Sequence, residues 1–235
     1  MITSFYTAGV GTAQIQKGMD VLANNIANVN TTGFKTQKTG FSDLLYTNMK
    51  YEGDNLQIGH GARLAKADTL FDVSAMDTTG RELDFALTNE NAFFGVMSDG
   101  QIKFTRDGNF SLSIQQDGSF LLATSSGEPV IGPDGRTITV DTQDMKDISS
   151  RIGVFAFDNL DGLQREENNL FVATARSGGA YVTDNSSLKQ RMLESSSVDY
   201  ADQMTEVIKN QRAFQFNTRM VQISDEIMQT INNLQ

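Results

Sequence analysis

The chain has 235 residues, of which 39% are hydrophobic and 20% charged, with a net charge of -10. This composition predicts a globular protein of one or two domains, and the acidic balance disfavours nucleic acid and anionic membranes as partners, because both need a basic surface. The lack of cysteine excludes disulfides and thiolate metal sites, the single histidine excludes a multi-histidine metal site, and no apolar run reaches the length of a membrane helix.

The N-terminal segment, residues 1–35, is predicted to contain a helix. Its apolar side chains recur at steps of three and four residues, and Ile15, Leu22 and Ile26 fall on one stripe. Gly33 suits the left-handed cap that ends a helix. The first residues lack the basic region and apolar core of a secretory signal, so the segment is interpreted as part of the mature protein.

Four asparagines lie close together near the end of this helix, at positions 24, 25, 28 and 30. Asparagine is a poor helix former and a good cap or turn residue, so one interpretation is a fraying helix end. The other is a ladder of amide groups that locks one subunit to the next, because buried asparagines fix the register of helix pairs.

The middle of the chain reads as β-structure. Residues 36–78 show no clear period and are predicted to be an extended connector. Residues 79–185 alternate short apolar runs with glycine-containing turns, which is typical of an antiparallel all-β domain. Hairpin turns are expected at the Asp-Gly pairs Asp99-Gly100, Asp107-Gly108, Asp117-Gly118, Asp134-Gly135 and Asp161-Gly162.

The C-terminal segment, residues 186–235, predicts a second helix, with Ser196 as its expected N-cap. Two apolar stripes run along it, one with the spacing of a coiled-coil seam and the other about 100° away. Such a helix is either buried on both sides or available for self-assembly. The whole chain therefore predicts an α+β fold, in which terminal α-helices pair as a coiled coil around a central antiparallel all-β domain. The two stripes contain Ala213, Phe216, Met220, Ile223 and Ile227, and Val207, Phe214, Val221 and Met228.

No motif in the sequence supports catalysis. His60 stands between two glycines without a nucleophile signature or an orienting carboxylate nearby in the chain. A calcium loop centred on Gly162 fails, because its first and twelfth positions fall on Phe157 and Asn168, where acids are needed. We therefore expect no enzyme activity, no cofactor and no metal.

Three segments near the two ends of the chain have distinctive sequences: residues 23–35 read ANNIANVNTTGFK, residues 193–199 read LESSSVD, and residues 211–217 read QRAFQFN. They resemble the signatures at the two ends of the flagellar rod and hook axial protein family. Residues 104–110, FTRDGNF, are similar to the core of its β-domain. The likeness covers nearly the whole chain.

The resemblance implies a structural subunit of the bacterial flagellar basal-body rod that polymerises helically into a drive shaft and transmits torque to the hook and filament. It implies four segments: an N-terminal helix (1–35), a connector (36–78), an outer β-domain (79–185) and a C-terminal helix (186–235). The implied partners are further copies of the chain, other rod and hook proteins, and the type III export apparatus, which would export the chain without cleaving a signal peptide. Neither nucleic acid nor direct membrane insertion is expected.

Two alternatives remain open: another axial protein of the proximal rod or hook type, and a carbohydrate-binding or hydrolytic β-domain protein. The lack of tryptophan disfavours the second, because tryptophan is the usual sugar-stacking residue. The residues expected at the subunit interface are Asn24, Asn25, Asn28, Asn30, Phe34, Gln211, Arg212, Phe214, Phe216, Asn217, Met220, Ile223 and Ile227.

Overall fold

The computed structural model describes residues 2–51, 54–115, 118–140 and 148–234. It combines a long helix at each end with antiparallel sheets between them. The chain forms two compact units, each assembled from separate stretches of sequence. Unit 1 contains Met1–Ala27, Gln37–Thr69 and Asp199–Gln235, and unit 2 contains Asn28–Thr36 and Leu70–Val198.

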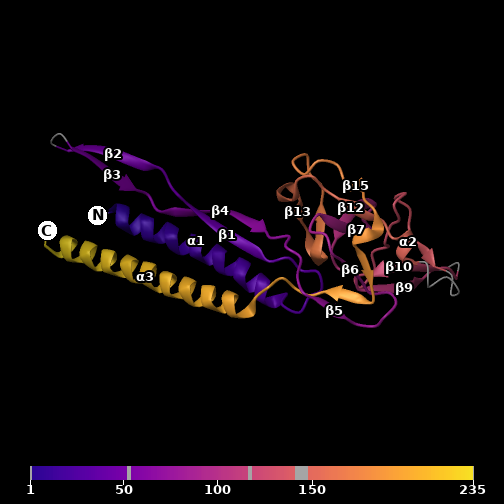
Figure 1. The fold of residues 1–235 in the computed structure, drawn as a ribbon. Helices are drawn as coiled ribbons and strands as arrows, with labels where there is room; N and C mark the ends of the chain where they lie inside the picture. The colour runs from indigo at the N-terminus through magenta and orange to yellow at the C-terminus, as the bar shows by residue number, and fades with distance from the viewer. Residues whose placement is uncertain (1, 52–53, 116–117, 141–147, 235) are drawn as a thin grey trace. The chain divides into compact units, whose positions relative to one another are not determined.

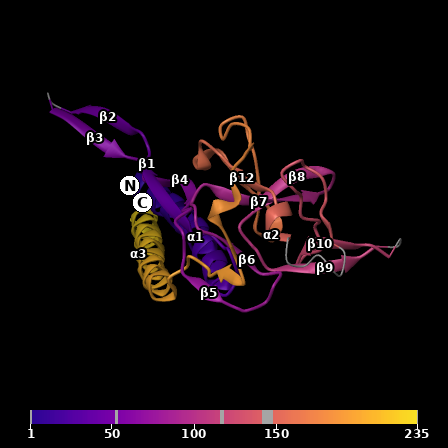
Figure 2. The same cartoon turned by 45° about the vertical axis from the view of Figure 1, so that its right-hand side comes forward.

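Unit 1 is built on two helices, α1 (Ile2–Ala27) and α3 (Tyr200–Asn233). They lie side by side and run in opposite directions, so that the N-terminus and the C-terminus come to the same end of the pair (Figures 1 and 2). The N-cap of α3 is Asp199, whose carboxylate accepts hydrogen bonds from two backbone amides of the first turn. The prediction of Ser196 as the cap was therefore wrong, because the helix begins a turn later.

Two antiparallel strand pairs complete unit 1. They fall within the range that was expected to be an extended connector, and β1 and β4 are in register from Gln37 opposite Thr69 to Asp43 opposite Ala62. Both β1 and β4 contact α1. The strands are β1 (Gln37–Asp43), β2 (Tyr46–Tyr51), β3 (Asp54–Gly59) and β4 (Ala62–Thr69).

Unit 2 has one sheet of six strands in the order β13-β14-β8-β7-β12-β15, one of three in the order β11-β10-β9, and the pairs β16-β6 and β17-β5. A short helix, α2 (Ile148–Arg151), accompanies them. The strands are β5 (Met76–Thr78), β6 (Phe85–Leu87), β7 (Ala92–Ser98), β8 (Gln101–Thr105), β9 (Phe110–Ile114), β10 (Phe120–Thr124), β11 (Thr139–Val140), β12 (Val154–Ala156), β13 (Gln164–Arg165), β14 (Leu170–Val172), β15 (Tyr181–Val182), β16 (Leu188–Gln190) and β17 (Met192–Glu194).

The core of unit 2 lies on both faces of β7. Successive side chains of a strand point to opposite faces of a sheet, and Phe93 and Phe94 accordingly enter two different apolar clusters. The ring of Phe93 packs edge-on against Phe157 and Phe171, and that of Phe94 packs edge-on against Phe110. The central strand is thus buried on both sides, which explains its continuous apolar sequence.

The Asp-Gly pairs have different structural roles. Asp99 and Gly100 both have positive φ and form the tight turn between β7 and β8, as predicted. The next pair is packed inside the unit, because a Cβ on Gly108 would lie 1.7 Å from the carbonyl oxygen of Phe85. Gly135, with φ of 74°, stands in an exposed turn where an added Cβ would meet nothing within 4 Å. Asp117 lies outside the described residues.

Candidate assembly surface

Helix α3 has two distinct lengthwise faces. None of its 34 described residues is buried, although one stripe is half-buried and recurs at alternating steps of four and three residues. Three of its members, Gln203, Asn210 and Asn217, lie against α1. Polar and apolar side chains alternate along the stripe, whose members are Gln203, Val207, Asn210, Phe214, Asn217, Val221 and Ser224.

A second, more apolar stripe of α3 is exposed. Phe216 is 68% exposed, and Met220, Ile223 and Ile227 are 42–47% exposed. Their steps of four, three and four residues are those of a helix–helix seam. An isolated apolar side chain on a surface needs no explanation, but an aligned row of large ones marks an interaction surface. We call these four residues the outer stripe.

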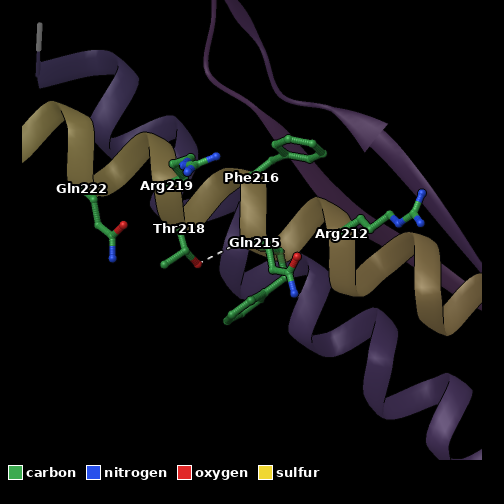
Figure 3. A pocket seen from close by; sticks show the side chains of 7 residues that line it. Arg212, Gln215, Phe216, Thr218, Arg219 and Gln222 are labelled. Carbon is green, nitrogen blue, oxygen red and sulfur yellow. Dashed lines mark hydrogen bonds between the residues drawn. The ribbon is translucent and has the colours of Figure 1, made fainter.

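Arginines lie on either side of the first residue of the outer stripe. An open hollow on α3 is lined by residues that include Arg212, Phe216 and Arg219, and Figure 3 shows the ring of Phe216 directed away from α1 with an arginine on each side of it along the helix. In the same hollow, the hydroxyl of Thr218 donates a 2.9 Å hydrogen bond to the carbonyl of Phe214, so this polar group is satisfied within the helix. The hollow therefore offers an aromatic ring between two cations, which suits an apolar partner carrying carboxylates.

The four asparagines near the end of α1 do not share one environment. Asn25 is buried within unit 1 and makes three hydrogen bonds there, two to the backbone of Gln37 and one to the side chain of Gln203. Asn24 and Asn30 are exposed. The remaining one, Asn28, is half-buried in unit 2, where its side-chain oxygen accepts a hydrogen bond from Thr31.

The other predicted interface residues differ in exposure. Phe34 is buried in unit 2, with the guanidinium of Arg165 4.0 Å from the centre of its ring. Gln211 is exposed, whereas Asn217 is half-buried on the α1 side of α3. The structure thus gathers Arg212, Phe216 and the rest of the outer stripe on one exposed helix face, and it places the others elsewhere.

Three charged residues that were not singled out from the sequence meet in the interior of unit 2. One carboxylate oxygen of Glu194 lies 2.6 Å from the ammonium of Lys35, and the other lies 2.8 Å from Nε of Arg106. All three side chains are at most 1% exposed. Each belongs to a motif quoted above, in residues 23–35, 104–110 and 193–199, and we call the three the ionic cluster.

Backbone groups complete the ionic cluster. The guanidinium of Arg106 donates hydrogen bonds to four carbonyl groups between Leu87 and Ala92, and the ammonium of Lys35 donates one to the carbonyl of Asp72. Burial, together with the positive charge of Arg106, lowers the pKa of Lys35, and the carboxylate of Glu194 opposes this shift. The cluster therefore ties the beginning, middle and end of the chain into unit 2.

A half-buried carboxylate, that of Asp107, lies next to Arg106 in the sequence. The hydroxyl of Thr32 donates a 2.5 Å hydrogen bond to Asp107, which also accepts one from the amide of Asn109. Burial raises the pKa of Asp107 despite these two bonds. Gly33 has φ of 63° and lies against the backbone of Arg106, so the turn after α1 is fitted closely to this part of unit 2.

The described part of the chain shows no arrangement for metal binding. Within residues 2–51, 54–115, 118–140 and 148–234, no group of three or more histidine, aspartate or glutamate side chains is placed to hold an ion. His60 is exposed on unit 1. No described helix is long and apolar enough to cross a membrane.

Comparisons with known proteins place the chain among structural components of the bacterial flagellum. The protein-family model described as flagella basal body rod protein matches residues 5–35. A second family model, described as flagellar basal body rod FlgEFG protein C-terminal, matches residues 189–234. The flagellar basal-body rod protein FlgG of Bacillus subtilis (strain 168) is 35% identical over 263 residues, covering 100% of this chain and 99% of the relative. FlgG of Buchnera aphidicola subsp. Schizaphis graminum is 30% identical, with 100% of both chains covered.

The chain belongs to the flagellar basal-body rod protein family. It is a structural subunit of the basal-body rod rather than an enzyme, as the sequence resemblance implied. A further relative, the flagellar hook-basal body complex protein FlhP of Bacillus subtilis, is 29% identical over the full length of both chains.

Proposed function

We propose that this chain is a distal-type rod subunit that polymerises helically, with the outer stripe of α3 as a contact between copies. The observation that carries the proposal is the exposed row of Phe216, Met220, Ile223 and Ile227 on a helix whose other face already lies against α1. A helix with two apolar faces needs two partners. The first is α1 of the same chain, and we assign a second copy to the other.

Charge along α3 supports a second copy as the occupant. The helix carries acidic residues at its beginning and end and basic residues between them, so a copy staggered along α3 brings opposite charges side by side. The basic ones are Lys209, Arg212 and Arg219, and the acidic ones are Asp202, Glu206, Asp225 and Glu226.

The subunit interface that we propose has fewer residues than the one predicted from the sequence. We propose that the outer stripe, together with Arg212, makes contacts between copies, and that the exposed Asn24 and Asn30 add to these contacts. Gln211 lies five residues before Phe216, about 140° around the helix, so we leave it outside this contact. Asn25 and Phe34 are buried within their own units, and we assign them an indirect role, namely to hold the end of α1 and the segment that follows it.

The remaining features of the proposal follow from family membership. Other rod and hook proteins are the proposed neighbours at the two ends of the polymer, and the flagellar export apparatus is the proposed route, without cleavage of a signal peptide. The helices of unit 1 would form the inner coiled coil, and the β-structure of unit 2 the outer part. The assembled rod would transmit torque to the hook.

Ile223→Asp tests the proposal, in cells whose only copy of the gene carries the substitution. Burying isoleucine stabilises a contact by about 1.5–3 kcal/mol, and a buried unpaired carboxylate costs several more. The expected result is loss of swimming and of rods in electron micrographs of basal bodies, with an unchanged circular dichroism spectrum of the purified chain. Gln229→Asp, an exposed position on α3 outside the outer stripe, serves as the control and should swim. Normal rods with Ile223→Asp would contradict the proposal.

A further inference from the structure

The face of α3 that lies against α1 carries an amide at every seventh residue. Gln203, Asn210 and Asn217 occupy these positions, and all three are half-buried. The half-buried residues between them are apolar. Amides are costly in such a seam unless they are paired or given room, and a seven-residue repeat of them is a device for specifying partner and register.

The facing positions on α1 match these amides with the same period. The amide nitrogen of Asn25 donates a 2.9 Å hydrogen bond to the side-chain oxygen of Gln203. A Cβ added to Gly18 would lie 3.8 Å from the amide nitrogen of Asn210, and one added to Gly11 would lie only 2.9 Å from that of Asn217. We call each facing pair a layer: Asn25 with Gln203, Gly18 with Asn210, and Gly11 with Asn217. From one layer to the next the position falls by seven on α1 and rises by seven on α3, as an antiparallel helix pair requires.

The glycine–asparagine layers and the Asn25–Gln203 layer exclude different shifts of α3 along α1. Because Gly11 has no side chain, it leaves the space that the amide of Asn217 occupies, and a shift by half a repeat would bring that amide opposite larger α1 side chains such as Ala8 or Ile15. A shift by a whole repeat would separate Asn25 from Gln203. The glycine layers therefore exclude half-repeat shifts, and the amide pair excludes whole-repeat shifts.

Asn25 is itself fixed in unit 1. Its nitrogen donates to the carbonyl of Gln37 at 2.8 Å, and its oxygen accepts from the amide of the same residue at 3.0 Å. The side chain is fully buried, so its hydrogen bonds join α1, the start of β1 and α3 at one point. Gln203 therefore bonds to an asparagine side chain that α1 and β1 hold in place without α3.

We propose that Asn25 and Gln203 are positioning residues, which select α1 of the same chain as the partner of α3 and set a single antiparallel register between them. The register determines the position of the outer stripe along the length of α1. The inference rests on the proposed function only for that last consequence, because the pairing itself lies within one chain.

Engineered cysteines test the register directly, since the chain has none of its own. The double variant G11C/N217C reports the observed register, because a disulfide needs Cβ atoms about 3.5–4.5 Å apart. The variant G18C/N217C reports a shift by seven residues, which is about 10 Å along a helix. Both are oxidised mildly as dilute purified full-length chain, and the intramolecular disulfide is followed on non-reducing gels.

The proposal expects the first pair to form its disulfide several-fold faster than the second. Adding Gln203→Leu, which keeps the seam apolar but removes the amide pair, should reduce this difference, whereas Gln229→Leu on the exposed side should preserve it in full. Hydrogen bonds between residues 33–36 and 194–197, beside the adjoining ends of the two helices, account for the preference that remains. Equal rates in the starting chain, cross-linking only between chains, or a preference undiminished by Gln203→Leu would each overturn the proposal. None of these outcomes depends on rod assembly, so the test is separate from that of the outer stripe.

Discussion

The ionic cluster predicts a large effect of one neutral substitution, Glu194→Gln. The carboxylate of Glu194 binds two buried cations, at 2.6 Å from Lys35 and 2.8 Å from Arg106. The amide of glutamine has nearly the same shape but carries no charge, so both buried cations lose the carboxylate that binds them. Removing one partner of a buried ion pair costs about 3–5 kcal/mol, and with two cations affected we expect the upper end of this range.

Thermal unfolding followed by circular dichroism or calorimetry measures this cost. For a chain of this size, 1 kcal/mol corresponds to roughly 2–4 °C, so the melting temperature of unit 2 should fall by about 10–20 °C. The matched control is Glu82→Gln, which breaks the 3.1 Å ion pair with Arg191, whose side chains are 45% and 58% exposed. Surface pairs contribute about 0–1 kcal/mol, so this variant should melt within a few degrees of the original chain.

The melting temperatures of Glu194→Gln and Glu82→Gln together show whether the ionic cluster stabilises unit 2. If Glu194→Gln melts no lower than Glu82→Gln, the ionic cluster does not stabilise unit 2 and the reasoning is refuted. A second substitution sharpens the result: adding Lys35→Met to Glu194→Gln removes one of the stranded cations and should recover part of the loss, because an apolar side chain tolerates this site better than an unpaired ammonium.

Three further predictions concern unit 2. Gly33→Ala should lower the free energy of unfolding in urea by at least about 1–2 kcal/mol, which is the cost of the positive φ alone. The new methyl group would in addition lie 2.4 Å from the backbone of Arg106, which raises the cost further. An unchanged urea midpoint would contradict this prediction. Asp107→Asn should raise stability at neutral pH: the pKa of Asp107 is raised on folding, so the folded chain binds the extra proton and wild-type stability falls as the pH rises from 3.8 through the raised pKa; this gain should vanish below pH 3.8, and a gain independent of pH would show another cause. A fragment of residues 28–198 should melt cooperatively at a higher temperature than one of residues 79–185, because the shorter fragment lacks Glu194, the carboxylate that pairs with Arg106; equal melting would show that the terminal segments do not support unit 2.

The terminal helices and the existence of two stripes could be predicted because helical periodicity is a local property of the sequence. Which stripe faces α1 could not. The half-buried seam contains Asn210 and Asn217 and is the more polar of the two, whereas the outer stripe looks like the better seam. Hydrophobicity alone cannot show that the facing residues of α1 are glycines that leave room for amides.

The ionic cluster could not be predicted for a different reason. Glu194 and Lys35 lie 159 residues apart, and nothing in their local sequence distinguishes them from charged surface residues. The sequence does contain one signal for the cluster, because each of the three charged residues lies inside a segment that resembles the rod and hook axial proteins. In the same way, Asn25 was correctly noticed as unusual, but its partner Gln203 is 178 residues away and was not identified.

The exposed turn at Gly135 has a practical consequence for microscopy. It lies in unit 2, while α1, α3 and the outer stripe all belong to unit 1, so a short peptide tag inserted there interrupts no residue of the helix pair. A fluorophore attached to such a tag would make individual rods visible in living cells, and their growth could then be timed. Tags at either end of the chain would instead extend α1 or α3, whose outer ends come together in unit 1 (Figure 1).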